Sequence, residues 1–258
     1  MSSFSVHKAA LEGEIGSRST PTIRSRKLDH SLAARQIGLA RSLLNDDPKL
    51  INVKDEDGRT PLQWAATTSS LSMLQLLLNY NPDLEARDTM GWTALMIASA
   101  SGHIEIVKEL LDAGAKVDSS NEKGQTSLHY AASKGNVPVG RLLIRNGADI
   151  NARDRANQHP LHRAAATGNN AFLQLLLNPP EGRAKTRLNT ADRAGNTPLH
   201  LALESGHGDA AVVLIEAGAD RERSNSEGQV PEEIEGVGGQ EQKKVLQYLV
   251  SKVGARKE

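Results

Sequence analysis

The chain has 258 residues, with 31 basic and 31 acidic side chains, eight histidines and no cysteine. This charge balance gives no overall attraction to nucleic acid or to an anionic membrane, and the lack of cysteine excludes disulfides, thiolate metal sites and a cysteine nucleophile. The first residues lack the apolar run of a signal peptide, and no stretch approaches the roughly 18 apolar residues of a spanning helix. We therefore expect a soluble protein of the cytoplasm and nucleus.

The N-terminal part of the chain predicts a divergent form of a unit that becomes regular further on. Residues 6–10 predict a first short helix and residues 32–44 a second. The segment of about 16–31 between them is rich in Ser, Thr, Arg and Lys, and it is expected to be a disordered insertion. Two other interpretations of this segment stay open: phosphorylation of Thr20, which precedes Pro21, and a nuclear-import patch.

One phrase recurs through the middle of the chain. Its copies are Gly58-Arg-Thr-Pro-Leu-Gln-Trp-Ala65, Gly91-Trp-Thr-Ala-Leu-Met-Ile-Ala98, Gly124-Gln-Thr-Ser-Leu-His-Tyr-Ala131, Asn157-Gln-His-Pro-Leu-His-Arg-Ala164 and Gly195-Asn-Thr-Pro-Leu-His-Leu-Ala202, with a worn copy from Gly228. Their first residues are spaced 33, 33, 33, 38 and 33 residues apart. A period of about 33 residues with the pattern Thr-Pro-Leu-His-x-Ala is the ankyrin signature. We therefore predict an all-α ankyrin-repeat solenoid of helix-turn-helix repeats with short β-hairpin tips.

Each part of the phrase has a physical task in such a repeat. The leading glycine, replaced once by Asn157, suits a turn position with positive φ. The threonine two residues later can cap the first helix, and the proline after it fits the first helical turn. A second helix with paired leucines follows, and Gly114, Gly147 and Gly218 are expected to end it.

The two ends of the array are atypical, as expected for solenoid caps. We predict seven repeats in a single domain, with an N-terminal capping repeat in residues 1–54, regular repeats in 55–224 and a C-terminal capping repeat and tail in 225–258. The last repeat ends in a predicted apolar helix near residues 240–250. A five-residue excess in residues 178–185, with two prolines, predicts a loop.

The sequence predicts neither catalysis nor a cofactor. Metalloprotease, phosphate-loop, nucleophile-elbow and dinucleotide-binding motifs are all lacking. His129, His162 and His200 recur at one position of the repeat, which favours hydrogen bonding between the loops of adjacent repeats, with metal or proton chemistry as the alternative. His103 and His207 begin the second helices and are also interpreted as structural.

The variable residues of the tips and first helices predict a binding surface, because ankyrin arrays present these elements on one concave face. The candidates are Asp57, Arg59, Trp64, Asp88, Thr89, Trp92, Gln125, Tyr130, Lys134 and Arg163. Exposed aromatic side chains beside arginine are the usual anchors of protein interfaces. The alternative for Trp64 and Trp92 is packing between repeats, although one face of a ring can pack while the other is exposed.

Residues between the consensus positions resemble the gankyrin family of proteasome assembly chaperones, especially its fungal members. The resemblance covers nearly the whole chain apart from residues of about 16–31 and 179–184. It rests on Asp55-Glu-Asp-Gly-Arg-Thr-Pro-Leu-Gln-Trp64, Gly91-Trp92, Leu128-His-Tyr-Ala-Ala-Ser-Lys134, Asn157-Gln-His-Pro-Leu-His-Arg-Ala-Ala165 and Gly206-His-Gly-Asp-Ala-Ala-Val-Val-Leu214.

The resemblance implies a chaperone that binds the C-terminal domain of one AAA ATPase subunit of the proteasome base on its concave face. Asp57, Arg59 and Lys134 match contact positions of that family, and Thr89 replaces an acidic contact for which Asp88 is expected to compensate. Residues 201–204 lack the cysteine of the family's retinoblastoma-protein-binding stretch, so that activity is not carried over. We expect a monomer when the chain is free. A generic ankyrin adaptor, or an inhibitor of a kinase or transcription factor, is the alternative.

Overall fold

The computed structural model describes residues 23–236 and 238–256, with side chains from residue 35 onward, and these ranges contain helices, turns and no strand. Contacts divide the chain into two compact units, one up to Glu122 and one from Lys123. The helix predicted for residues 6–10, and Thr20, lie outside the described residues. The predicted count of seven repeats stays a prediction, because the described ranges contain five complete helical hairpins and parts of the two terminal repeats.

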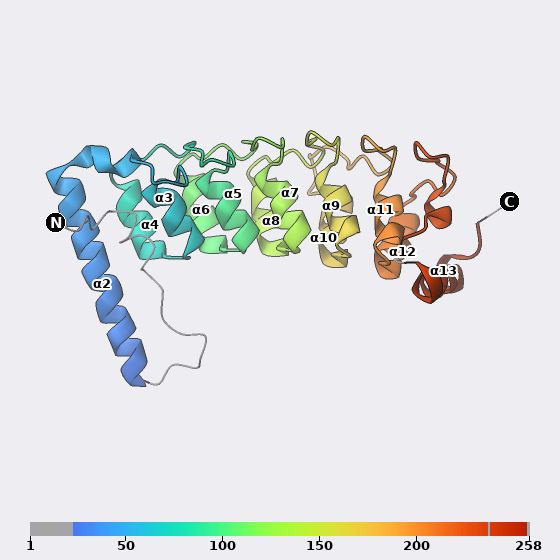
Figure 1. Cartoon of the computed structure of the whole chain (residues 1–258), viewed down its shortest axis with the longest axis horizontal. Coiled ribbons are helices and arrows are strands. Elements are labelled where there is room, and N and C mark those ends of the chain that lie inside the picture. Colours follow the sequence, from blue (N-terminus) through green and yellow to red (C-terminus); the bar gives the residue numbers. More distant parts are fainter. Residues whose placement is uncertain (1–22, 237, 257–258) are drawn as a thin grey trace. The chain divides into compact units, whose positions relative to one another are not determined.

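The unit up to Glu122 contains a long helix followed by two helical hairpins (Figure 1). Its elements are α2 (Ile23–Asp46), the 3-10 helix η2 (Pro48–Asn52), α3 (Pro61–Thr67), α4 (Leu71–Leu78), α5 (Ala94–Ser101) and α6 (Ile104–Asp112). Helix α3 packs against α5, while α4 packs against both α6 and α2. First helices therefore form one layer and second helices another.

The unit from Lys123 repeats this arrangement with three hairpins and a final helix. Its elements are α7 (Ser127–Lys134), α8 (Val137–Arg145), α9 (Pro160–Ala166), α10 (Asn170–Leu177), α11 (Pro198–Glu204), α12 (Gly208–Glu216), the 3-10 helix η3 (Pro231–Glu233) and α13 (Gly239–Val253). Helix α9 packs against both α7 and α11, α10 packs against both α8 and α12, and α13 covers α12. The predicted C-terminal helix is confirmed, and η3 takes the place of a first helix against α11.

The prediction that residues of about 16–31 form a disordered loop is wrong for residues 23–31. Helix α2 begins at Ile23, so residues 23–31 are helical together with the predicted helix of residues 32–44. Between Ile23 and Asp46 there is no proline and a single glycine, Gly38, so nothing in this stretch breaks a helix. The Arg and Lys residues that suggested a solvated loop are also good helix formers.

The predicted starts and ends of the regular helices are confirmed. Thr60 caps α3 in a capping box, in which the Thr60 backbone N–H donates to Gln63 Oε1 at 2.8 Å. The second helices end before glycines with φ of 98°, 99° and 94°, at Gly114, Gly147 and Gly218. The residues after Leu177 form the predicted loop, since no helix begins again before Pro198.

The predicted β-hairpin tips are tight turns that are too short to count as strands. In the tips that begin at Asp55, Asp88, Asp154, Asp192 and Asn225, the backbone N–H of the first residue donates to the carbonyl oxygen four residues later, as from Asp55 to Arg59 at 3.0 Å. Neighbouring tips are joined by a single backbone hydrogen bond, as from Thr89 N to Asp57 O at 3.0 Å. The leading residues of the repeated phrase all have the expected positive φ: Gly58, Gly91, Gly124, Asn157, Gly195 and Gly228.

We expect Gly195→Ala to destabilise the fold more than Gly228→Ala. Both glycines have left-handed φ, 81° and 77°, so alanine costs roughly 1–2 kcal/mol at each. At Gly195 a Cβ would also lie 2.6 Å from Ser226 N on the next tip, whereas nothing lies within 4 Å of a Cβ at Gly228. Urea unfolding of the two variants measures the difference, and equal losses of stability would contradict this close approach of the tips.

The core lies between the two layers of helices within each unit. Leu110, Leu143 and Leu161 are fully buried, as predicted from the repeat. The largest fully buried side chain is Phe172 of α10, which packs on Gly140 of α8. A Cβ at Gly140 would lie 2.4 Å from Phe172 Cζ, so the missing side chain in one repeat makes room for a large one in the next.

Candidate protein-binding surface

An acidic or amide residue three positions before the turn glycine organises the tips. Asp55 Oδ1 accepts hydrogen bonds from the backbone N–H groups of Asp57 at 3.0 Å and Arg59 at 2.8 Å. The same pair of bonds is made at the tips of Asp88, Asp154, Asp192 and Asn225. One oxygen thus shapes the turn, and the other oxygen or nitrogen of the same side chain can bind another side chain.

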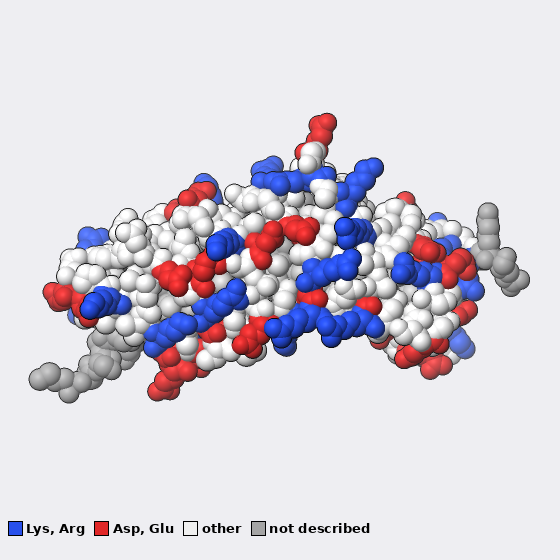
Figure 2. All heavy atoms as spheres, turned by 90° about the horizontal axis from the view of Figure 1, so that it is seen from above, with Lys and Arg blue, Asp and Glu red and all other residues white. Residues whose placement is uncertain are grey.

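Figure 2 shows that basic and acidic side chains are both spread over this side of the molecule.

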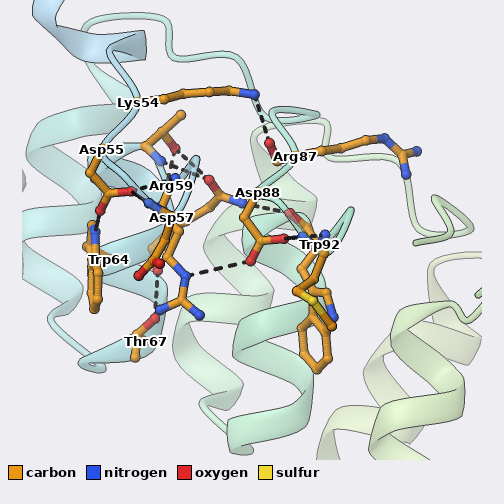
Figure 3. Close-up of polar contacts among 12 residues, drawn as sticks. Lys54, Asp55, Asp57, Arg59, Trp64, Thr67, Arg87, Asp88 and Trp92 are labelled. Carbon is orange, nitrogen blue, oxygen red and sulfur yellow. Dashed lines mark hydrogen bonds and ion pairs between the residues drawn. The ribbon is translucent and has the colours of Figure 1, made fainter. Parts of the chain in front are cut away.

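In the unit up to Glu122, two of these carboxylates hold a tryptophan and an arginine (Figure 3). Asp55 Oδ2 accepts a hydrogen bond from Trp64 Nε1 at 2.6 Å. The guanidinium carbon of Arg59 lies over the Trp64 ring, 4.9 Å from its centre, and Arg59 Nε forms an ion pair with Asp88 Oδ2 at 3.6 Å. A cation over the face of an indole is attracted by the ring. Trp64 and Arg59 are therefore fixed against each other by the carboxylates of two successive tips.

This cluster is partly open to solvent. The Arg59 side chain is 31% exposed, and Trp64 and Trp92 are both half-buried. This intermediate burial is compatible with both interpretations of the tryptophans, so their role as binding anchors stays a prediction. Asp57, on the same tip as Arg59, and Thr89, on the next tip, are exposed.

The expectation that the Asp88 carboxylate would itself meet a partner is corrected by its position. The Asp88 side chain is only 4% exposed. Its Oδ1 accepts from the backbone N–H groups of Met90 and Trp92, both at 2.9 Å, and its Oδ2 faces Arg59. Asp88 therefore supports Arg59 from within the fold and does not replace an exposed acidic contact at Thr89.

In the unit from Lys123, the same arrangement holds Arg163. Asp154 Oδ2 accepts from Arg163 Nη2 at 2.7 Å, and the arginine side chain is 31% exposed while the aspartate is 2% exposed. Burial alone would raise the pKa of Asp154, but the hydrogen bonds from Arg163 and from the Gln158 backbone bring that pKa below its usual value. The carboxylate is therefore ionised at neutral pH and anchors the arginine.

The remaining candidates lie in the first hairpin of this unit. Tyr130 Oη donates to Gln125 Oε1 at 2.7 Å, and Lys134, the last residue of α7, is exposed. Sequence reasoning missed Asp55 and Asp154, which orient Trp64 and Arg163. The signal was present, since Asp or Asn stands three positions before the turn residue in every copy of the phrase.

Two of the three recurring histidines, His129 and His200, bridge neighbouring repeats as predicted, whereas the buried Nε2 of His162 has no hydrogen-bond partner among the described residues. His129 Nδ1 accepts from Thr126 N at 3.1 Å, and its Nε2 bonds to the Gln158 carbonyl of the next tip at 3.0 Å. His200 makes the corresponding pair of bonds, to Thr197 N and the Gln229 carbonyl, both at 3.1 Å. An unprotonated Nδ1 with a protonated Nε2 is the neutral ring, so these bonds require an uncharged histidine.

A glutamine takes the place of histidine in the first hairpin of the unit up to Glu122. Gln63 Oε1 accepts from Thr60 N at 2.8 Å, and Gln63 Nε2 donates to the Trp92 carbonyl at 2.6 Å. An amide therefore makes the same two bonds as a neutral imidazole, without titrating. This equivalence defines the position as structural.

Burial keeps two of the histidines uncharged. It lowers the pKa of His129 to about 4, and burial together with the neighbouring His159 lowers the pKa of His162 to about 4. His162 Nδ1 accepts from the His159 backbone N–H at 3.1 Å, and the two rings are stacked with centres 5.6 Å apart. No cluster of three acidic or histidine side chains in the described ranges is placed to hold a metal ion.

The tips and helical hairpins define a repeat protein. The family described as Ankyrin repeats (3 copies) matches residues 31–121, 88–154 and 128–225. The chain belongs to this ankyrin-repeat family. It is also similar to Ankyrin repeat and SAM domain-containing protein 6 of Rattus norvegicus, with 33% identity over 60 residues. That match covers 23% of this chain and 7% of the rat protein, so the chain spans a small part of that relative.

Membership of the family makes protein binding the general function of the chain, because ankyrin repeats serve as surfaces for protein partners. Proteins of this kind are typically non-catalytic scaffolds. Among the described helices, none has the length and apolar composition that crossing a lipid bilayer requires.

Proposed function

We propose that the chain is an assembly chaperone that binds the C-terminal domain of one AAA ATPase subunit of the proteasome base, in the cytoplasm and nucleus. The observation that carries the binding surface is the Arg59–Trp64 pair, which two turn carboxylates hold in place while it stays partly exposed. The identity of the partner rests on the resemblance to the gankyrin family at Asp57, Arg59 and Lys134. In this proposal binding alone does the work, since the bound chaperone keeps the base from docking prematurely onto the proteolytic core.

The charges of the tips and first helices suit a folded partner with complementary charges. Asp57 and Lys134 are exposed, and the side chains of Arg59 and Arg163 are each 31% exposed to solvent. Separated charges of both signs fix the orientation of a partner as well as attract it, because a rotated partner would bring like charges together.

The partner's identity is tested by affinity purification of the tagged chain followed by mass spectrometry. Recovery of one proteasomal ATPase subunit above its fellow subunits is expected. Recovery of a kinase or a transcription factor in its place would favour the alternative, an adaptor or inhibitor that uses the same face.

We expect the pair Asp57→Lys and Lys134→Glu to weaken binding to the purified ATPase C-terminal domain by roughly tenfold or more, because like charges would meet across the interface. The pair leaves the net charge unchanged, and both side chains are exposed, so the melting temperature should not move. Arg59 is not reversed, because a glutamate there would face Asp88 and disturb the fold.

The matched control is the pair Glu105→Lys and Lys108→Glu. Both residues are exposed on the second helix α6, and this pair also conserves net charge. It should leave the affinity as it is in the unmodified chain. Equal affinities for both pairs would mean that the partner binds away from the tips and first helices.

A further inference from the structure

A second charged surface lies on the other helical layer of the unit from Lys123. The loop after α10, which contains the insertion of residues 178–185, carries three exposed basic side chains, Arg183, Lys185 and Arg187, and α8 adds exposed Arg141 and Arg145. In Figure 2 a group of Lys and Arg side chains stands at the upper edge of the molecule, in the region of α8 and α10. The insertion itself contains one acidic side chain, Glu181, so the segment is clearly basic.

The insertion is held to the repeats by specific hydrogen bonds. Asn151 Nδ2 donates to the Lys185 carbonyl at 3.0 Å, and Asn151 Oδ1 accepts from Arg187 N at 2.8 Å. Arg183 Nη2 donates to the Arg145 carbonyl at 2.8 Å. That bond uses one of the five N–H donors of the guanidinium. These hydrogen bonds attach the loop to the preceding repeat, and its basic side chains are still exposed. One wall of a hollow is formed by this loop.

Between this wall and the ends of the second helices lies a hollow of about 630 Å3. Its apolar lining consists of Leu177, Pro179, Pro180, Leu188 and Ala217. Two basic residues, Arg183 and Lys185, line it together with one acidic residue, Glu181, and the polar Asn178 and Thr186. Its volume lies within the range of binding pockets, and its lining mixes apolar, polar and charged groups. It has room for an apolar side chain beside two cations.

We propose that this hollow is a second binding site, which takes an acidic segment of a protein with an apolar side chain between its carboxylates. The prolines and leucines would receive the apolar side chain, and the guanidinium of Arg183 would bind a carboxylate through two parallel hydrogen bonds. The lining residues include no aromatic side chain on which a nucleic-acid base would stack. The site uses the insertion and second helices, so it goes beyond the proposed function of the tips.

The test uses the full chain and a fluorescently labelled peptide in which glutamates flank a central leucine. We expect the pair Arg183→Glu and Lys185→Glu to weaken binding of this peptide roughly tenfold or more. The matched control is the pair Arg155→Glu and Arg193→Glu, which removes the same charge from exposed positions on the tips of the same unit. This control pair should keep nearly the full affinity.

Three results would overturn the proposal. If both pairs weakened binding equally, the peptide would be attracted by the overall positive charge of the unit and not by this hollow. Unchanged binding of a peptide with serine in place of the leucine would show that the hollow is not used. Tighter binding of a single-stranded RNA than of the peptide would assign the surface to nucleic acid.

Two further variants separate this site from folding and from the proposed function. If Arg183→Glu lowers the melting temperature, Arg141→Glu with Lys185→Glu tests the same surface through two other exposed positions. The pair Asp57→Lys and Lys134→Glu should leave peptide binding unchanged, so failure of the chaperone proposal and failure of this one give different results.

Discussion

Replacing Phe172 with alanine is expected to lower the free energy of unfolding by about 3–5 kcal/mol. The ring is fully buried between α10 and α8, and its removal leaves a cavity that Gly140 cannot fill, because glycine has no side chain. Urea unfolding followed by circular dichroism measures the loss. A loss under about 1 kcal/mol would mean that this part of the core is loosely packed.

The pairing of Phe172 with Gly140 gives a sharper form of the same prediction. Gly140→Ala alone should cost about 1–3 kcal/mol, because the new Cβ would overlap the ring. Combined with Phe172→Leu, part of this cost should disappear, so that the double-mutant cycle shows a coupling of about 0.5–3 kcal/mol. Gly38→Ala is the control, since nothing lies within 4 Å of a Cβ there and alanine favours a helix. Additive effects of the first two changes would contradict the packing.

Lowering the pH from about 6.5 to about 4 is expected to destabilise the unit from Lys123 by roughly 3 kcal/mol for each of two histidines. The pKa of His129 and His162 is about 4 in the fold, against an ordinary value of 6.5. Between these values the unfolded chain binds protons that the folded chain does not. Their contribution to stability is therefore complete above pH 6.5, falls as the pH drops, and changes no further below about pH 4.

The chain itself supplies the variant that isolates this effect. Gln63 makes both hydrogen bonds of the repeated histidine without titrating. We expect His129→Gln with His162→Gln to keep most of the stability at pH 7 and to lose most of the extra destabilisation between pH 7 and pH 5. Urea midpoints at the two pH values measure this, and the same pH dependence in the variant would show that other groups cause it. A variant with alanine at both positions should lose stability at pH 7 as well, because it also loses the hydrogen bonds.

The parts of the fold that the sequence predicted are those decided within a few residues. The positive φ of the turn glycines, the Thr60 cap, the ends of the second helices and the loop after α10 all follow from local chemistry. The start of α2 at Ile23 did not, because its basic residues are compatible with both a solvated loop and a helix.

The contacts of the turn carboxylates could not be predicted from the tips alone. Asp55 binds Trp64, nine residues later, and Asp154 binds Arg163, also nine residues later. For Asp88 the residue nine positions on is the apolar Ile97, and Asp88 turns to Arg59 of the preceding tip. The partner therefore depends on two repeats at once. For this reason the sequence indicated the candidate surface but predicted that Asp88 would be exposed on it, whereas the Asp88 side chain is buried.

The anchoring of Trp64 and Arg163 has a consequence for affinity. A long exposed side chain samples several rotamers, and a partner that fixes it must overcome that conformational entropy, about 0.5–1.5 kcal/mol for each side chain. Here Asp55 and Asp154 have already restricted this freedom during folding, through hydrogen bonds of 2.6 and 2.7 Å. A partner that closes over either side chain meets a surface that is rigid in advance, so more of its contact energy becomes affinity.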